Sequence, residues 1–183
     1  MFSLFQYFKN RLIVRNFQEI IKNDKIYIYF IFMDDLKIKH LKPKKNSIYH
    51  QGSINPKTLT KYYESASDQP VIYRSGLELQ FINYCETNPQ IVKWASEAIG
   101  IDYYCRIDKK THTYYPDYII ESKSGQKTII EIKPYNQTVK PKMTDSLWLK
   151  QSWIKNVDKW KAAKAWATKN GLEFMIVTEK FFP

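Results

Sequence analysis

Residues 113–134 read TYYPDYIIESKSGQKTIIEIKP. This stretch contains two runs rich in β-branched and aromatic residues, Tyr114–Glu121 and Lys127–Lys133, on either side of the turn formers Ser124 and Gly125. Two such runs around a short turn are typical of a β-hairpin. We therefore predict that they form neighbouring antiparallel strands.

Three charged side chains fall close together in this hairpin. Side chains alternate between the two faces of a strand, so Glu131 and Lys133 share one face, and the hairpin can bring Asp117 near them. Two carboxylates removed from water need a counter-ion, and a hard cation such as Mg²⁺ prefers oxygen ligands. Such a cation beside a lysine suits phosphodiester hydrolysis. The alternative is a ladder of salt bridges on a half-exposed sheet.

These residues also carry a resemblance to a known motif. Pro116-Asp117 followed by Glu131-Ile132-Lys133 resembles the PD-(D/E)XK motif of the restriction-endonuclease-like nucleases. Within that superfamily the chain is similar to the head completion nucleases of T-even-type tailed phages and, more distantly, to the TnsA endonuclease subunits of transposons. The resemblance covers about residues 72–180 and includes Ser75–Phe81, Asn88-Pro89, Trp94–Glu97, Lys159–Ala163, Gly171–Phe174 and Val177–Glu179.

The resemblance implies a metal-dependent DNA nuclease. In such a nuclease Asp117 and Glu131 hold Mg²⁺, for which Mn²⁺ can substitute, and the backbone carbonyl of Ile132 is a third ligand. Lys133 orients or activates the attacking water, and Glu78 completes the acidic set. The implied role is to cut packaged phage DNA during head completion and head–tail joining. The implied location is the host cytoplasm during phage assembly, with association with the virion as the alternative. The implied partners are DNA and the portal or neck proteins of the virion.

Two other functions are compatible with the same residues. One is a virion joining protein that binds DNA without cutting it. The other is a transposase-like subunit, similar to TnsA, that cleaves only together with a partner. The complete motif favours the nuclease over the binding protein, because a relic site usually loses the lysine or one of the carboxylates.

Glu78 has two interpretations. Ser75 and Glu78 have the spacing of a capping box, in which the glutamate accepts a hydrogen bond from an unpaired amide at the start of a helix. The resemblance instead makes Glu78 a ligand of the metal or of a water molecule. Both roles remain open from the sequence.

The composition predicts one folded domain with a polyanionic partner. The chain has 183 residues, 44% of them hydrophobic, and carries a formal charge of +11. Nucleic acid is the expected partner, since no basic amphipathic membrane helix is evident. Cys85 and Cys105 lack CxxC spacing and are expected to be reduced, buried thiols. The histidines have no spacing typical of a zinc site.

We divide the chain into three parts. Residues 1–32 form an N-terminal extension, which we expect to be either a segment ahead of a natural start at Met33 or a loosely attached helix. Residues 33–70 form a basic, extended arm and a polar linker, and 71–183 form the nuclease domain. The arm is expected to lie along DNA phosphates, with a merely solvated charge run as the alternative; its candidate contacts are Lys42, Lys44 and Lys45.

The order of the elements predicts an α/β fold. A helix over Ser75–Thr87 precedes a strand over Ile99–Ile107 and the hairpin, and a helix over Thr144–Asn170 precedes a strand over Leu172–Thr178. The last strand follows a helical crossover, so it should pair in parallel with its neighbour. We expect a restriction-endonuclease-like α-β-β-β-α-β core, with a central mixed sheet flanked by helices.

Residues after the motif are further candidates for holding the DNA backbone. Lys155 and Lys159 lie four residues apart on one flank of the long helix, and Gln137 follows the lysine of the motif. Ordinary solvation of an amphipathic helix explains the lysines equally well, and a surface position is usual for glutamine.

Overall fold

A computed structural model describes residues 51–63 and 69–182 of the chain. The predictions for residues 1–32 and for Lys42, Lys44 and Lys45 lie outside the described residues. The described elements are, in chain order, β1 (Gly52–Ile54), η2 (Pro56–Thr58), β2 (Val71–Tyr73), α3 (Gly76–Thr87), β3 (Ile91–Ser96), β4 (Ile101–Cys105), β5 (Lys110–Tyr114), β6 (Tyr118–Ser122), β7 (Lys127–Ile132), α4 (Tyr135–Thr138), α5 (Leu147–Lys169), β8 (Glu173–Val177) and η3 (Glu179–Phe181).

The central sheet has four strands in the order β3-β6-β7-β8. The strands β3, β6 and β7 pair antiparallel, and β8 pairs parallel with β7. The predicted hairpin is therefore confirmed as β6 and β7, and its turn uses Gly125 at a φ of 79°. The predicted parallel pairing of the last strand and the α-β-β-β-α-β class of the core are confirmed as well.

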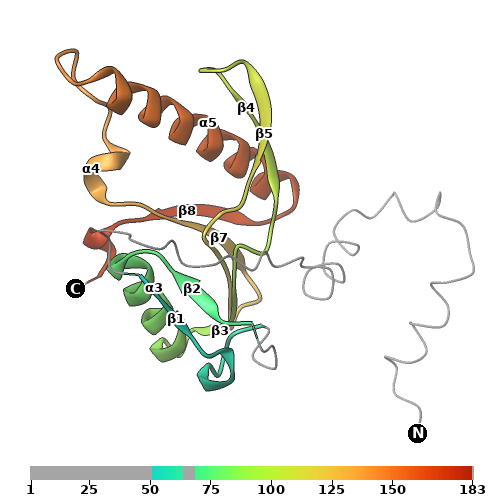
Figure 1. Ribbon diagram of the computed structural model, residues 1–183. Coiled ribbons are helices and arrows are strands. Elements are labelled where there is room, and N and C mark those ends of the chain that lie inside the picture. The colour runs from blue at the N-terminus through green and yellow to red at the C-terminus, as the bar shows by residue number, and fades with distance from the viewer. Residues whose placement is uncertain (1–50, 64–68, 183) are drawn as a thin grey trace, which may run out of the picture. The chain divides into compact units, whose positions relative to one another are not determined.

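Helix α3 covers one face of this sheet, as Figure 1 shows. The apolar residues Phe81, Ile82 and Cys85 of α3 are buried in one core cluster with Ile130 and Ile132 of β7. Because side chains alternate along β7, the residues between these two isoleucines and next to them face away from α3. The alternation thus directs Glu131 and Lys133 toward the other side of the sheet.

Helix α5 lies on that other side of the sheet (Figure 1). Its N-cap is Ser146, whose hydroxyl accepts a hydrogen bond from the backbone nitrogen of Leu149, and Gly171, at a φ of 71°, follows its end. Ala163 and Ala167 form the buried part of its apolar stripe. Small side chains there allow the helix to pack closely on the sheet.

The first core strand is not the one predicted. We expected the chain to cross over at Val92–Ala98 and to form the strand at Ile99–Ile107, whereas the core strand is β3, which pairs with β6. The register of β3 shifts between Ile91 and Lys93, so its burial does not alternate with the period of a regular strand. Because buried and exposed residues do not alternate along β3, the sequence pattern did not indicate a strand there.

The strands β4 and β5 form a separate two-stranded ribbon, inserted between β3 and β6. Ile101, Tyr103 and Cys105 are the buried residues of β4, and the ribbon packs against α5 (Figure 1). An ion pair between a half-exposed arginine and a buried aspartate fixes this contact: Asp158 of α5 accepts hydrogen bonds from the side chain of Arg106 at 2.7 Å and from its backbone nitrogen at 3.0 Å. The insertion thus holds α5 in place over the sheet.

Part of the predicted basic arm is folded. Strand β1 pairs antiparallel with β2, and Leu59 and Tyr62 are buried in the core cluster. Lys61 donates hydrogen bonds from its amine to two carbonyl oxygens at the end of α3, those of Cys85 and Asn88. Over 51–63 the chain therefore packs against the core and does not form an arm that reaches away from it. The burial of its apolar residues outweighs the effect of its few charges.

No helix in the described ranges 51–63 and 69–182 is both long and apolar enough to cross a membrane.

Candidate active site

The strand register brings Asp117 and Glu131 together. Tyr118 pairs with Ile130, so the residue before Tyr118 and the residue after Ile130 lie at the same end of the hairpin. Oδ2 of Asp117 accepts a hydrogen bond of 2.6 Å from the backbone nitrogen of Ile132. The backbone carbonyl of Asp117 accepts a second bond, of 3.0 Å, from the nitrogen of Glu97. The loop before β6 is thus tied to both neighbouring strands.

Glu131 is buried, with 3% of its surface exposed. Its Oε1 lies 3.0 Å from Nζ of Lys133, whereas Oε2 is buried and has no hydrogen-bond partner among the described residues. Burial and the nearby charge of Asp117 raise the pKa of Glu131 to about 7, against the opposing effect of Lys133. The carboxylate therefore occupies a position that is unfavourable for a bare negative charge.

Lys133 contacts two oxygen atoms of β7. Its Nζ donates to the carbonyl oxygen of Ile132 at 3.2 Å and forms the ion pair with Glu131. Burial lowers the pKa of Lys133, but the charges of Asp117 and Glu131 raise it by more, so the pKa lies above its usual value. The amine is consequently a fixed positive charge at this site.

Glu78 takes part in capping α3. Its Oε2 accepts a hydrogen bond of 2.9 Å from the backbone nitrogen of Arg74, and Oε1 lies 3.2 Å from the hydroxyl of Ser75. The Ser75 hydroxyl in turn accepts from the backbone nitrogen of Glu78 at 3.1 Å. Burial and the charge of Asp117 raise the pKa of Glu78, so this carboxylate is also close enough to Asp117 to interact with it. Both oxygens of Glu78 are thus engaged at the start of α3.

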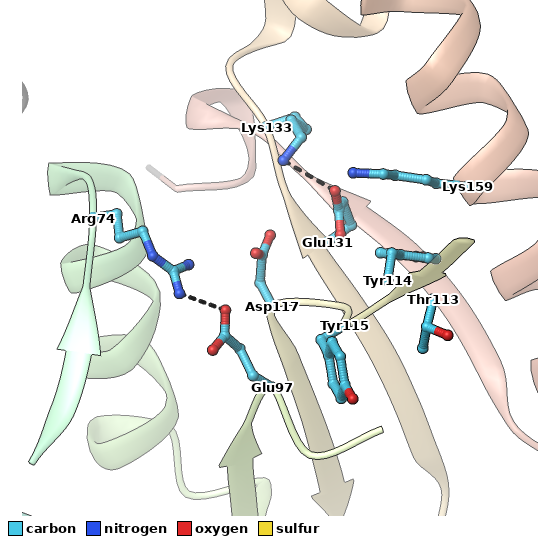
Figure 2. Close-up of a pocket in the computed structure, with 9 residues that line it drawn as sticks. All are labelled: Arg74, Glu97, Thr113, Tyr114, Tyr115, Asp117, Glu131, Lys133 and Lys159. Carbon is cyan, nitrogen blue, oxygen red and sulfur yellow. Dashed lines mark hydrogen bonds and ion pairs between the residues drawn. The ribbon is translucent and has the colours of Figure 1, made fainter. Parts of the chain in front are cut away.

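Figure 2 shows the pocket that Asp117, Glu131 and Lys133 line, with a volume of about 350 Å³. Glu78 lies outside its lining set. The lining of the pocket comes from five parts of the chain that are distant in sequence. The residues are Arg74, Glu97, Thr113, Tyr114, Tyr115, Asp117, Glu131, Lys133 and Lys159.

Sequence reasoning missed several of these lining residues. Arg74 and Glu97 form an ion pair of 2.6 Å across the pocket from β7, and the φ of Glu97 is 49°. Tyr114, whose hydroxyl is buried without a partner among the described residues, closes the side next to Glu131. No spacing in the sequence links these residues, since only the bend after β3 and the inserted ribbon bring them to the site.

The predicted DNA contacts separate into two groups. Lys159 lines the pocket, whereas Lys155, one turn earlier on α5, is exposed and stands outside the lining set. Gln137 is exposed on the short helix α4 and also stands outside that set. These two residues are placed to contact only what lies outside the pocket.

The donor set of the pocket fits a hard divalent cation. Asp117 and Glu131 supply carboxylate oxygens, and the carbonyl of Ile132 lies beside them, within reach of the same lysine. The buried Oε2 of Glu131 supports this fit, because a buried carboxylate oxygen without a hydrogen-bond donor destabilises the fold unless another group contacts it. A cation bound there would supply the missing partner and offset the repulsion between the two acids.

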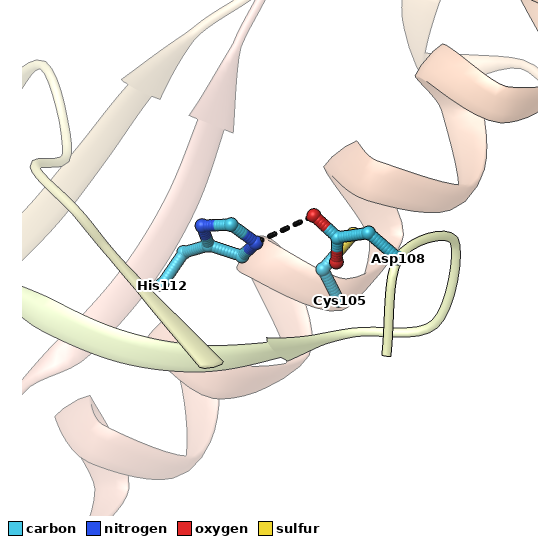
Figure 3. Close-up of side chains that lie close together, drawn as sticks. All are labelled: Cys105, Asp108 and His112. Atoms are coloured by element: carbon cyan, nitrogen blue, oxygen red, sulfur yellow. Dashed lines mark hydrogen bonds and ion pairs between the residues drawn. The ribbon is translucent and has the colours of Figure 1, made fainter. Parts of the chain in front are cut away.

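A second group of metal-ligating side chains lies at the far end of the ribbon, shown in Figure 3. The ligand atoms of Cys105, Asp108 and His112 all lie within 4.8 Å of one another, although the spacing of the histidines gave no reason to expect a metal site there. Asp108 is already paired with Nε2 of His112 at 2.8 Å and accepts from the backbone nitrogen of Lys110 at 3.3 Å. These bonds account for the cluster as the closing contacts of a hairpin turn.

Comparison with known proteins gives two matches. The sequence profile of the family described as "TnsA-like endonuclease N terminal" matches residues 88–179. The chain is also similar to the "Head completion nuclease" of Enterobacteria phage T4, with 36% identity over 139 residues that cover 71% of this chain and 91% of the phage T4 protein. The matched range contains every charged residue of the pocket lining except Arg74. These residues are Glu97, Asp117, Glu131, Lys133 and Lys159.

Proposed function

We propose that this chain, which belongs to the TnsA-like endonuclease family of restriction-endonuclease-like nucleases, hydrolyses DNA with a divalent cation held by Asp117 and Glu131. The single observation that carries the proposal is the buried and unpartnered Oε2 of Glu131, next to Asp117 and Lys133 in one pocket. Burying two neighbouring carboxylates destabilises the folded protein, and a bound cation offsets that cost. Mg²⁺ is the proposed ion, with Mn²⁺ as a substitute.

The residues of the site have separate proposed roles. Asp117, Glu131 and the carbonyl of Ile132 hold the cation, which, when bound, polarises the phosphate and lowers the pKa of a water molecule. Lys133 positions the attacking water and stabilises charge on the phosphate, since its amine is held beside Glu131. Both oxygens of Glu78 already interact with groups at the start of α3, so we propose that Glu78 orients water rather than binding the cation directly.

The reaction is the hydrolysis of one phosphodiester bond. The oxygen of water forms a bond to phosphorus while the bond from phosphorus to one ester oxygen breaks. One proton of the water ends on the leaving oxygen, and the other is released as the new phosphate monoester ionises. The side chains of the pocket hold the reacting groups and are unchanged at the end.

The chain is also proposed to act in phage head completion. The relative in phage T4 is a head completion nuclease, and the similarity covers nearly all of that protein. We propose that the substrate is packaged DNA, that the work is done in the host cytoplasm as heads join tails, and that the portal or neck of the virion is the site of assembly. The exposed Lys155 and Gln137 are proposed to contact the DNA backbone outside the pocket.

A cleavage assay tests the function directly. Purified wild-type protein and Asp117→Ala are incubated with linear and circular DNA in Mg²⁺, in Mn²⁺ and in EDTA. The proposal predicts cleavage by the wild-type protein with either cation, none in EDTA, and none by Asp117→Ala. Binding of DNA without cleavage by the wild-type protein indicates a joining protein instead, and cleavage only after a second protein is added indicates a subunit that works with a partner.

A further inference from the structure

Lys159 is the second lysine of the pocket, and two tyrosine rings from the β4-β5 ribbon hold it there. Its Nζ lies 5.8 Å from the ring centroid of Tyr103 and 5.5 Å from that of Tyr114. Figure 2 shows the side chain reaching from α5 over Tyr114 toward Glu131. Contacts of this kind attract an ammonium group to the faces of the rings and fix its position. The amine is therefore aimed into the pocket rather than into solvent.

The Lys159 amine differs from the other cations of the pocket in its partners. Lys133 and Arg74 each form an ion pair with a carboxylate, Glu131 and Glu97 respectively. Among the residues that the structure describes, Lys159 forms no salt bridge, and its charge interacts with Glu131 and Asp117 only at longer range. Burial lowers the pKa of Lys159, so the protein holds this charge at a cost. A partly buried ammonium without a carboxylate partner is a suitable site for an anion.

We propose that Lys159 is a catalytic residue of the DNA hydrolysis proposed above, and that its ammonium binds a nonbridging oxygen of the scissile phosphate. The inference rests on that function and goes beyond the earlier expectation of a general contact with the DNA backbone. In phosphodiester hydrolysis, negative charge is spread over the nonbridging oxygens, where a positioned cation stabilises it. Lys159 gives up no proton in this step and acts through its charge alone.

Lys159 lies at the acidic pair, where it can contact the scissile phosphate itself rather than only attract DNA by its charge. Lys133 donates to Glu131 and to the Ile132 carbonyl, which leaves one N–H of its amine for the water or the phosphate. Lys159 approaches the same carboxylate from α5, across the pocket from Arg74. A phosphate lying against the acidic pair would thus have one amine from β7 and another from α5.

The test compares Lys159→Met with Lys161→Met. Methionine keeps an unbranched side chain that can lie on the tyrosine rings but removes the charge. Lys161 is an exposed lysine on the same helix, two residues away and outside the lining set, so it controls for a general loss of positive charge. Two quantities are measured for each variant: the single-turnover rate of cleavage at saturating protein with Mg²⁺, and the Kd for the same DNA in EDTA.

The inference predicts that Lys159→Met lowers the single-turnover rate by about 100-fold, the size of effect typical of losing one group that stabilises developing charge. Its Kd should change by no more than about threefold, because only one phosphate contact is lost. Lys159→Arg should recover part of the rate, whereas Lys161→Met should match the wild-type protein in both quantities. Equal melting temperatures of all variants exclude a merely structural role.

Two results would overturn the inference. A wild-type rate for Lys159→Met, or a loss confined to Kd, contradicts a role at the scissile phosphate. Asp117→Asn is measured alongside, to distinguish a failure of the role of Lys159 from a failure of the proposed nuclease function. Cleavage by Lys159→Met at the rate of the wild-type protein, with none by Asp117→Asn, contradicts only the role of Lys159. Absence of cleavage by the wild-type protein with either cation contradicts the proposed function, and the role of Lys159 with it.

Discussion

Asp117 and Ile132 are joined by a hydrogen bond of 2.6 Å from the backbone nitrogen of Ile132 to Oδ2 of Asp117. The bond spans from the loop before β6 to the last residue of β7, so it fixes the aspartate relative to the strand that carries the glutamate. It also leaves the second oxygen of Asp117 as the one available to a ligand from the pocket. The acidic pair is thus positioned by the backbone rather than by the side chains alone.

Asp117→Asn should separate charge from structure at this position. An asparagine still offers an oxygen acceptor to the nitrogen of Ile132, but it removes one of the two carboxylates. We expect cleavage to fall by at least about 100-fold, since both the cation and the positioned water depend on that charge. The melting temperature should stay equal or rise, because repulsion with Glu131 is relieved. Plasmid cleavage and thermal unfolding measure the two effects, and an active Asp117→Asn protein would contradict the assignment.

Binding of the cation should depend on pH through Glu131. Burial and Asp117 raise the pKa of this carboxyl to about 7, so below that pH the cation must displace a proton before it can bind. We therefore expect the affinity for Mn²⁺ to fall as the pH drops from about 8 to 6, with release of a proton on binding at the lower pH. Isothermal titration in two buffers of different ionisation enthalpy measures both. An affinity that is constant over this range would show that the glutamate is not a ligand.

Glu131→Gln should make the cation-free protein more stable at high pH. The folded-state pKa of about 7 lies above the usual value of 4.5, so the folded protein prefers the protonated form, and stability is lost as the pH rises from 4.5 through 7. Glutamine has no charge to bury, and the free energy of unfolding should increase by about 1 to 3 kcal/mol at pH 8, since each pKa unit corresponds to about 1.4 kcal/mol. The difference should vanish near pH 4, where the wild-type carboxyl is protonated. Urea unfolding at both pH values in EDTA measures this, and a less stable variant at pH 8 contradicts it.

The sequence was sufficient for the hairpin and for the meeting of its charges. The β-branched runs on either side of Gly125 specify two strands, and the pairing of Tyr118 with Ile130 then follows from the short turn between them. Alternation along β7 places Glu131 opposite the face that packs on α3. These are local relations, and a single sequence contains them.

The rest of the site depends on relations that are not local. Strand β3 escaped prediction because its register shift breaks the alternation of buried residues, and that error placed the first core strand at Ile99–Ile107. The left-handed backbone at Glu97 then turns the chain into the ribbon, which brings Tyr114 to the pocket. Lys159 reaches it only through the packing of α5 on that ribbon. Contacts between elements so far apart in the chain cannot be predicted from the spacing of residues in a single sequence.

The ribbon should also matter for stability. Arg106 is half exposed, whereas the side chain of Asp158 is 5% exposed and accepts two of its hydrogen bonds from Arg106. Arg106→Met removes the guanidinium and leaves a buried carboxylate with one backbone donor, so we expect a loss of about 1 to 3 kcal/mol in the free energy of unfolding. Because this pair joins the ribbon to α5, the variant should also lose cleavage rate.

A double variant controls this experiment. Arg106→Met combined with Asp158→Asn no longer buries an unpaired charge, and it should recover part of the lost stability. Chemical denaturation of the wild-type protein, both single variants and the double variant completes the cycle. Strictly additive effects of the two substitutions would show that the pair contributes nothing beyond its separate residues.

The most direct measurement of the central claim is the anomalous scattering of Mn²⁺ in crystals of the wild-type protein. The account predicts a peak in the pocket, about 2.0 to 2.3 Å from carboxylate oxygens of both Asp117 and Glu131, the range of bonds between a hard cation and oxygen. The same soak of Asp117→Asn crystals should show no peak there. A peak confined to Cys105, Asp108 and His112, or a pocket without Mn²⁺ at saturating concentration, would contradict the claim that Asp117 and Glu131 form a metal centre.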